Sequence, residues 1–346
     1  MKNKILIYGA LGYTGNLFVT HALDKELPIV LGARKEEVKD RATALGLEYK
    51  VFEIKNTAEI IPFLSDVFLV VNFANIQFSL NQALIEACIQ TSTHYIDLGS
   101  EYYDISEVFK YHDAAVASGS MLMPGYGFNL VPTDIAASIA QQLLPDAKEL
   151  IFGFAAIGES SRGTVKSVLR DATKKGFIRK DGKLESSTPA TETFVFSGDG
   201  KKYELVNNPI MGEVITAWAG TKIPSIKTYS WFPWILVQFM KGRLNFLRKF
   251  LFKYADLFFP LGPTEKQLQN GYSYSWVEAT DGNKNKVLVT IKGPEAYLFT
   301  VQIIQQVIRQ LVKGKVSSGV ITPAFFGRAL IESIDGVQIM SEGEAC

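Results

Sequence analysis

Three glycines with a regular spacing, Gly9, Gly12 and Gly15, follow a short apolar run near the start of the sequence. In such a loop the first glycine lets the chain turn off a strand, the second lets backbone amides approach a pyrophosphate, and the third lets the next helix pack closely. The anion would lie at the helix N-terminus, and Tyr13 and Thr14 stand within the same loop. The pattern predicts a dinucleotide site. Its spacing, GxxGxxG, differs from the simple GxGxxG fingerprint, so a plain strand-to-helix turn is the alternative.

The end of the second apolar run indicates which dinucleotide would bind. A site for NAD usually has an acidic residue there for the ribose hydroxyls, whereas this sequence has Arg34 followed by Lys35. A guanidinium suits a ribose 2′-phosphate. We therefore predict NADP(H) as the cofactor, with NAD less favoured. The alternative for Arg34 is a solvated surface arginine.

A third group of polar residues follows the fourth apolar run, in the segment VVNFANI. The carboxyl end of that strand should lie near the nicotinamide, at the crevice where ligands bind in such sheets. Asn72, Ala74 and Asn75 are therefore candidate cofactor neighbours, although Asn72 could equally cap the next helix. For Asp97 and Glu101, after the fifth run, we expect structural or capping roles.

The elements that would position these residues alternate regularly through the first third of the chain. Short apolar runs, expected to be strands, are separated by helical segments, which is typical of a parallel sheet covered by helices on both faces. We predict an α/β fold: a Rossmann-type doubly wound parallel sheet in residues 1–125, then a second, α+β domain with a mixed or antiparallel sheet in residues 126–315. The segment 272–293, with DGNKN at its centre, predicts a hairpin.

Composition limits the function classes. The 346 residues are too many for one compact core, so two domains are expected. With 36 basic and 35 acidic residues, the net charge of +1 argues against a nucleic-acid partner. The two cysteines and three histidines have no metal-ligand spacing, so we expect no metal. The N-terminus has no signal-peptide pattern and few cysteines are present, which predicts a cytoplasmic location.

Residues 229–260 are unusually apolar and aromatic. The uncharged run inside this segment is too short for a spanning helix. Apolar side chains recur at a spacing of three and four, which predicts one helical face, at Leu244, Leu247, Leu251, Tyr254 and Phe258. Interleaved lysines and arginines fit a helix that dips into a membrane surface. The alternatives are a lid over a long acyl substrate and a core or homodimer helix pair.

Taken together, these motifs resemble the saccharopine dehydrogenase-like oxidoreductases, and most closely the branch with trans-acting enoyl reductases. The segments that carry the resemblance occur in order over most of the chain: YGALGYTG, LGAR, VNFANIQFSLNQALIEACIQTSTHYIDLGSE, GFNLVPTD, SSRGT and SGVITPAFFG. The resemblance implies a Rossmann domain, an α+β domain, and a C-terminal segment, residues 316–346, that returns to the first domain. The sequence departs from the family pattern at Asn75-Ile76 and at Asn129-Leu130.

The chemistry is less constrained than the cofactor. No tyrosine has a lysine four residues later, and no GxSxG elbow occurs. This leaves hydride transfer in which the cofactor supplies the reactive group. Tyr126, Asn129 and Arg162 are candidate catalytic or substrate-binding residues, with packing, capping and surface pairing as the alternatives. The resemblance implies an NADPH-dependent reductase of a C=C bond in a lipid or acyl thioester. An amino-acid-linked imine reductase and a non-catalytic cofactor-binding scaffold remain alternatives.

Overall fold

The computed structural model of the chain describes residues 2–24, 26–74, 77–198 and 200–344. It divides into two compact units: Met1–Val131 with Tyr297–Phe326, and Pro132–Ala296 with Gly327–Cys346. This division differs from the predicted ranges 126–315 and 316–346. The chain enters the first unit a second time at Tyr297, and after Phe326 it goes back to the second unit.

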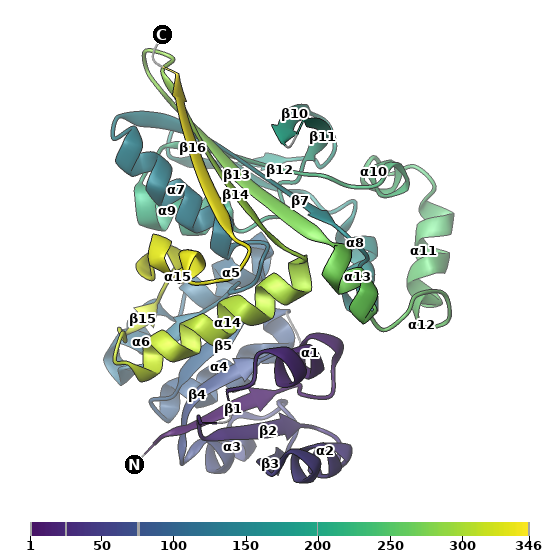
Figure 1. Cartoon of the computed structure of the whole chain (residues 1–346), viewed down its shortest axis with the longest axis vertical. Coiled ribbons are helices and arrows are strands. Elements are labelled where there is room, and N and C mark those ends of the chain that lie inside the picture. Colours follow the sequence, from purple (N-terminus) through teal and green to yellow (C-terminus); the bar gives the residue numbers. More distant parts are fainter. Residues whose placement is uncertain (1, 25, 75–76, 199, 345–346) are drawn as a thin grey trace. The chain divides into compact units, whose positions relative to one another are not determined.

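The first unit is built on a seven-stranded sheet in the order β15-β6-β5-β4-β1-β2-β3 (Figure 1). Neighbouring strands pair in parallel throughout this sheet. The strands are β1 (Lys4–Tyr8), β2 (Ile29–Ala33), β3 (Glu48–Val51), β4 (Val67–Asn72), β5 (His94–Asp97), β6 (Met121–Met123) and β15 (Gly319–Val320). The order reverses between β1 and β4, the point beyond which ligands bind in doubly wound sheets. The predicted Rossmann-type sheet is confirmed.

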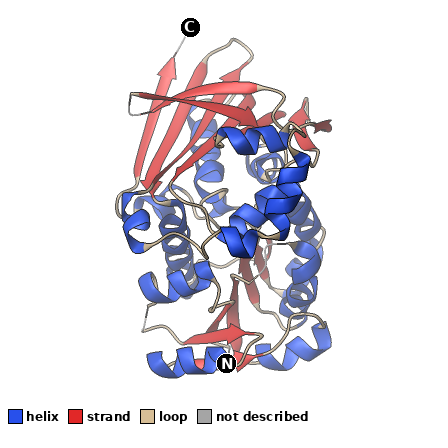
Figure 2. Cartoon of the chain, turned by 90° about the vertical axis from the view of Figure 1, so that its right-hand side faces the viewer, coloured by secondary structure: helices blue, strands red, loops and turns tan. Residues whose placement is uncertain are grey.

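Helices cover both sides of this sheet, as Figure 2 shows. They are α1 (Tyr13–His21), α2 (Glu37–Leu45), α3 (Thr57–Ile60), the 3-10 turn η1 (Ile61–Leu64), α4 (Phe78–Gln90), α5 (Tyr102–Phe109), α6 (His112–Ser118), α14 (Ala296–Val312) and the 3-10 turn η2 (Pro323–Phe325). Because both faces are covered, the central strands are buried apolar runs; Ile5, Leu6 and Ile7 of β1 are fully buried.

Contacts between segments far apart in sequence hold α14 in the first unit. The Gln305 side chain donates to the Ala22 carbonyl at 2.9 Å. The Phe128 amide donates to Thr300 Oγ1 at 3.0 Å. The predicted boundary kept α14 with the hairpin that precedes it in sequence, because no local pattern shows a contact between residues nearly 300 positions apart.

The second unit is built on a nine-stranded mixed sheet whose main path is β10-β11-β12-β7-β13-β14-β16 (Figure 1). Strands β12 and β7 pair in parallel, whereas β13 is antiparallel to both β7 and β14. The strands are β7 (Ala147–Ile157), β8 (Gly176–Lys180), β9 (Lys183–Ser187), β10 (Thr193–Gly198), β11 (Lys201–Asn207), β12 (Ser225–Ser230), β13 (Tyr272–Asp281), β14 (Lys286–Pro294) and β16 (Gln338–Glu344). The predicted hairpin is β13–β14. Strand β16 pairs with β14, which places the part of the C-terminal segment from Gly327 on in this unit. The beginning of that segment, with β15, lies in the first unit as predicted.

The helices of the second unit are α7 (Val131–Leu143), α8 (Arg162–Asp171), α9 (Glu213–Thr221), α10 (Trp234–Met240), α11 (Asn245–Lys253), α12 (Ala255–Phe258), α13 (Glu265–Asn270) and α15 (Arg328–Glu332). Aromatic side chains fill part of its core: the rings of Phe196 and Trp276 stack with their centroids 4.0 Å apart. Over the described part of the chain, no helix combines the length and the apolar character needed to cross a bilayer.

Candidate dinucleotide-binding site

The glycine loop joins β1 to α1 and brings three backbone segments together. Gly9 has a φ of +86°, and a Cβ there would lie 2.5 Å from the Ala74 amide nitrogen. A Cβ on Gly15 would lie 2.3 Å from the Gly9 carbonyl oxygen. These two positions therefore exclude any side chain, because backbone packs on backbone. The loop after β4, with Ala74, lies beside the glycine loop, as its predicted role requires.

Gly12 differs from the other two glycines because a side chain there would have almost no close neighbours. It is the N-cap of α1, and its amide donates to the Gly9 carbonyl at 2.9 Å. A Cβ on Gly12 would meet only that carbonyl, at 3.3 Å. The first turn of α1 carries no acidic side chain. An uncrowded backbone at a helix N-terminus, without an acidic side chain in the first turn, fits a pyrophosphate.

Tyr13 and Thr14 open α1 directly after Gly12. The Tyr13 ring packs edge-on against the ring of Tyr297, with the centroids 5.2 Å apart. Tyr297 is the first residue of the returning segment of this unit. The start of α14 therefore supports the first turn of α1, next to the candidate phosphate position.

Arg34 directly follows β2 and is exposed. Its charge acts on two groups nearby: it opposes the rise in the pKa of Tyr8, which burial lifts to about 12, and it adds to the lowering of the Glu53 pKa, which is due mainly to Lys55. Tyr8 ends β1, so the guanidinium lies near the carboxyl ends of both β1 and β2. Lys35 is exposed, with its Nζ 4.0 Å from a Glu37 carboxylate oxygen.

A buried polar chain crosses the carboxyl ends of β4 and β5. Asn72 is fully buried; its amide donates to the Tyr95 hydroxyl at 3.1 Å, and its Oδ1 accepts from the Ala74 amide at 3.0 Å. The Tyr95 hydroxyl in turn donates to Asp97 Oδ2 at 2.8 Å. This row of hydrogen bonds therefore fixes the loop that carries Ala74.

Asp97 extends this row of hydrogen bonds to two further loops. Its Oδ1 accepts from the amide of Gly99 at 3.0 Å and from the amide of Gly125 at 3.2 Å. Burial raises the pKa of Asp97 to about 6, although these hydrogen bonds oppose the rise. Sequence reasoning singled out Asn72 and Asp97 separately but missed Tyr95. In the sequence Tyr95 is only one more residue of a buried strand.

The candidate catalytic residues have different surroundings. Tyr126 is buried, and its hydroxyl donates to the Ile321 carbonyl at 3.0 Å, which ties the loop after β6 to the end of β15. Asn129 is exposed, and its amide donates to Ser100 Oγ at 3.3 Å. Arg162 belongs to the second unit, where its Nε donates to the Phe259 carbonyl at 2.9 Å. Asn75 lies outside the described residues.

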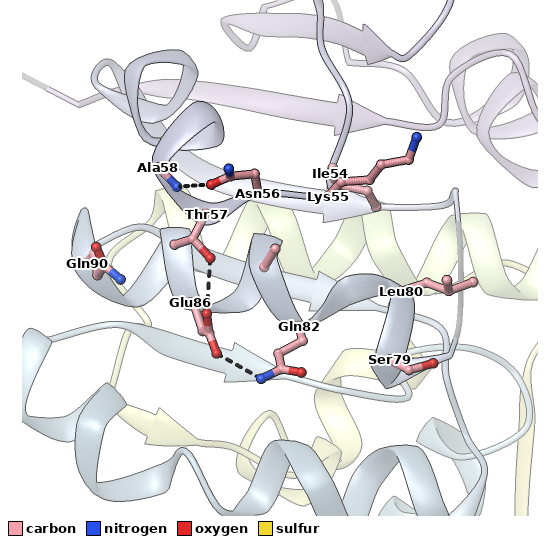
Figure 3. A pocket seen from close by; sticks show the side chains of 11 residues that line it. Ile54, Lys55, Asn56, Thr57, Ala58, Ser79, Leu80, Gln82, Glu86 and Gln90 are labelled. Atoms are coloured by element: carbon pink, nitrogen blue, oxygen red, sulfur yellow. Dashed lines mark hydrogen bonds between the residues drawn. The ribbon is translucent and has the colours of Figure 1, made fainter.

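An open groove of about 680 Å³ lies beside α3 and α4 (Figure 3). Asn56 caps α3 by accepting from the Ala58 amide, and Thr57 donates to Glu86 across the groove at 3.0 Å. None of the predicted cofactor residues lines it. Among the described residues, no group of histidine, cysteine and acidic side chains is arranged to hold a metal.

Comparison with known proteins agrees with this geometry. Residues 5–123 match the family model of the saccharopine dehydrogenase NADP binding domain. The chain is 24% identical to a saccharopine dehydrogenase-like oxidoreductase of Rattus norvegicus, over 97% of this chain and 96% of that protein. It is 23% identical to the Homo sapiens protein of the same name, over 96% and 95%.

Among solved structures, the fold is similar to apo saccharopine dehydrogenase (L-Glu forming) from Saccharomyces cerevisiae. The TM-score is 0.66 at 12% identity, and the match covers 99% of this chain and 100% of that one. These findings support an oxidoreductase whose residues 5–123 form an NADP-binding domain similar to that of saccharopine dehydrogenase.

Proposed function

We propose that the protein is an NADPH-dependent reductase of a carbon–carbon double bond in a lipid or acyl thioester. NADPH, when bound, supplies the hydride. The chain's own residues bind and orient it: Gly9, Gly12 and Gly15 with the start of α1 receive the pyrophosphate, Arg34 pairs with the 2′-phosphate, and Lys35 adds positive charge. Asn72 and Ala74 form the wall nearest the nicotinamide.

The state of the arginines in the second unit supports this substrate class over an amino acid. An amino-acid substrate calls for a free guanidinium that grips its carboxylate in two parallel hydrogen bonds. Arg162, the clearest candidate in the sequence, is held instead by the Phe259 carbonyl and by Asp256 Oδ1, the latter at 3.3 Å. The other arginines of this unit, namely Arg170, Arg179, Arg243, Arg248 and Arg328, also donate to protein oxygens.

The amino-acid-linked imine reductase remains a second candidate, because the relatives carry the name of saccharopine dehydrogenase. A cofactor-binding scaffold without turnover is a third candidate. In the segment GFNLVPTD, Asn129 and Leu130 stand where the related family has Asp and Ser. The Tyr126 hydroxyl donates to the Ile321 carbonyl and the Asn129 amide donates to Ser100, so neither residue is assigned as the proton donor. The homodimer and the cytoplasmic location stay predictions.

Turnover assays separate these candidates. We expect NADPH to be consumed with enoyl thioesters of long acyl chains and not with a mixture of 2-oxo acid and amino acid. The variant Arg162→Ala should retain kcat/KM within a factor of about three, because in this proposal Arg162 contacts protein oxygens and not the substrate. If the parent consumes no NADPH with the acyl thioesters but reduces the imine, and Arg162→Ala abolishes that imine reduction, the protein is an amino-acid-linked imine reductase. Cofactor binding without turnover of either panel would establish the scaffold.

A further inference from the structure

The segment from α10 to Leu261 exposes large apolar side chains in an unusual concentration. Phe246 is 86% exposed, Leu257 is 80% exposed and Trp234 is 70% exposed. Helix α11 has no buried residue. We call the following set the apolar patch: Trp234, Ile235, Leu244, Phe246, Leu247, Phe250, Phe252, Tyr254, Leu257, Phe258 and Leu261. Isolated exposed apolar residues are normal, whereas a contiguous group marks an interaction surface.

The apolar segment is broken into short helices. Gly242 has a φ of +71° and Leu244 a φ of +53°, and these left-handed residues separate α10 from α11. Leu251 turns inward against the core cluster that includes Leu169 and Phe239. The predicted helical face is divided at Tyr254, which follows α11 and precedes α12, and its other residues stay exposed.

Polar contacts to α8 add to the apolar packing of Phe239, Met240 and Leu251. Lys166 Nζ lies 2.8 Å from Asp256 Oδ2, and the Arg162 Nε donates to the Phe259 carbonyl. The Arg248 guanidinium donates to the Leu169 carbonyl. The segment is therefore anchored through α10, Leu251 and these polar contacts, while most aromatic rings of α11 and α12 stay exposed.

The charges within the patch have one sign. Lys241, Arg243, Arg248, Lys249 and Lys253 lie in this segment, and its single acidic residue, Asp256, is already paired with α8. Lys253 Nζ lies 5.2 Å from the centroid of the Tyr254 ring, so cation and aromatic surface are adjacent. Exposed aromatic residues beside lysines are the combination that binds an anionic lipid interface.

We propose that the apolar patch docks on the surface of a membrane containing anionic lipids. Phe246, Leu257 and Trp234 enter the boundary between headgroups and acyl chains, while Lys249 and Lys253 meet the lipid headgroups. This goes beyond the proposed reaction and does not require it, because docking needs no cofactor. A second copy of the chain is the less favoured occupant, because a symmetric contact would bring the cations of both copies together without acidic partners.

Flotation of the full chain with vesicles tests this proposal without any turnover. We expect binding to vesicles of phosphatidylcholine with phosphatidylserine, and weak binding to phosphatidylcholine alone. The double variant F246S/L257S should lower vesicle affinity by about 100-fold, because two largely exposed apolar anchors are lost. The variant K249Q/K253Q should lower it by about fivefold for each lysine at low salt.

Matched controls use exposed residues of the same unit outside the patch. L184S/V195S removes two exposed apolar side chains of β9 and β10, and K201Q/K202Q removes two exposed lysines of β11; both should bind like the parent. The parent should also show a blue shift in tryptophan fluorescence on binding, which Trp234→Phe reduces. Absence of flotation, or flotation that F246S/L257S leaves unchanged, overturns the proposal. A dimer in sedimentation that F246S/L257S dissociates assigns the patch to a second copy instead.

Discussion

The two units use glycine for different kinds of close contact. In the first unit, Gly15 lets backbone approach backbone, since a Cβ there would lie 2.3 Å from the Gly9 carbonyl oxygen. In the second unit, Gly153 makes room for a side chain, since its Cβ would lie 2.1 Å from the Trp276 ring. The first contact is local in sequence and forms a recognisable motif. The second joins residues more than a hundred positions apart and has no sequence signature. The cofactor can therefore be predicted from a sequence motif in the first unit. The second unit has no such motif from which to predict the substrate.

The largest expected effects come from filling these two contacts. Gly15→Ala and Gly153→Ala should each lower the free energy of unfolding by about 3 kcal/mol, because neither a backbone nor a stacked indole can move away cheaply. Of the two, only Gly15→Ala should also weaken NADPH binding. Urea unfolding followed by circular dichroism, together with cofactor titration, measures both quantities.

Gly163→Ala provides the control for this pair, because its Cβ would lie at an ordinary 3.7 Å from Ser161 Oγ in the first turn of α8. It should be neutral or slightly stabilising. If Gly15→Ala retains parental stability and NADPH affinity, the account of the glycine loop is wrong.

A buried acid in each unit provides a second comparison. Burial raises the pKa of Glu213 to about 8, whereas Asp97, with more hydrogen bonds, reaches about 6. Glu213 is 1% exposed and accepts a hydrogen bond from Thr133 Oγ1 at 3.2 Å. Between pH 5 and 8 the folded state therefore holds a proton that the unfolded state has lost. The stability that the protonated Glu213 contributes is complete below the unfolded pKa of Glu213. It falls as the pH rises from that value through 8, by at most about 1.4 kcal/mol per pH unit.

Glu213→Gln should remove this dependence, since the amide imitates the protonated acid in shape. Relative to the parent, the variant should gain stability steadily from pH 5 to pH 8 in urea unfolding. Glu204→Gln, at an exposed position of β11, should follow the parent at every pH. Parallel pH profiles for Glu213→Gln and the parent would show that Glu213 is ionised in the folded protein.

Gly12 separates binding from folding within the glycine loop. Gly12→Ala should lower the free energy of unfolding by less than about 1 kcal/mol, because its Cβ meets a single atom at 3.3 Å. It should nevertheless raise the Kd for NADPH about tenfold or more, because the methyl group occupies the approach to the pyrophosphate. If the variant binds NADPH as tightly as the parent, the pyrophosphate does not bind next to Gly12.

The fold was predictable where elements repeat over short distances. The alternation of apolar runs and helical segments gave the parallel sheet, and the DGNKN turn marked β13–β14, where Asp281 Oδ1 accepts from the amides of Asn283 and Asn285. The position of α14 was not predictable, because its partners Ala22 and Phe128 lie far away in sequence. Likewise, Arg162 has the residue type of an anion ligand, and only the fold shows that Asp256 and Phe259 already hold it.

Titration of the parent and Arg34→Ala with NADPH and with NADH tests the central claim most directly. We predict that the parent binds NADPH more tightly than NADH. Arg34→Ala should raise the Kd for NADPH by about 30-fold through loss of a charge-assisted contact to the 2′-phosphate, and leave the Kd for NADH unchanged. Equal affinity of the parent for the two cofactors, or a preference for NADPH that survives in Arg34→Ala, would contradict the account.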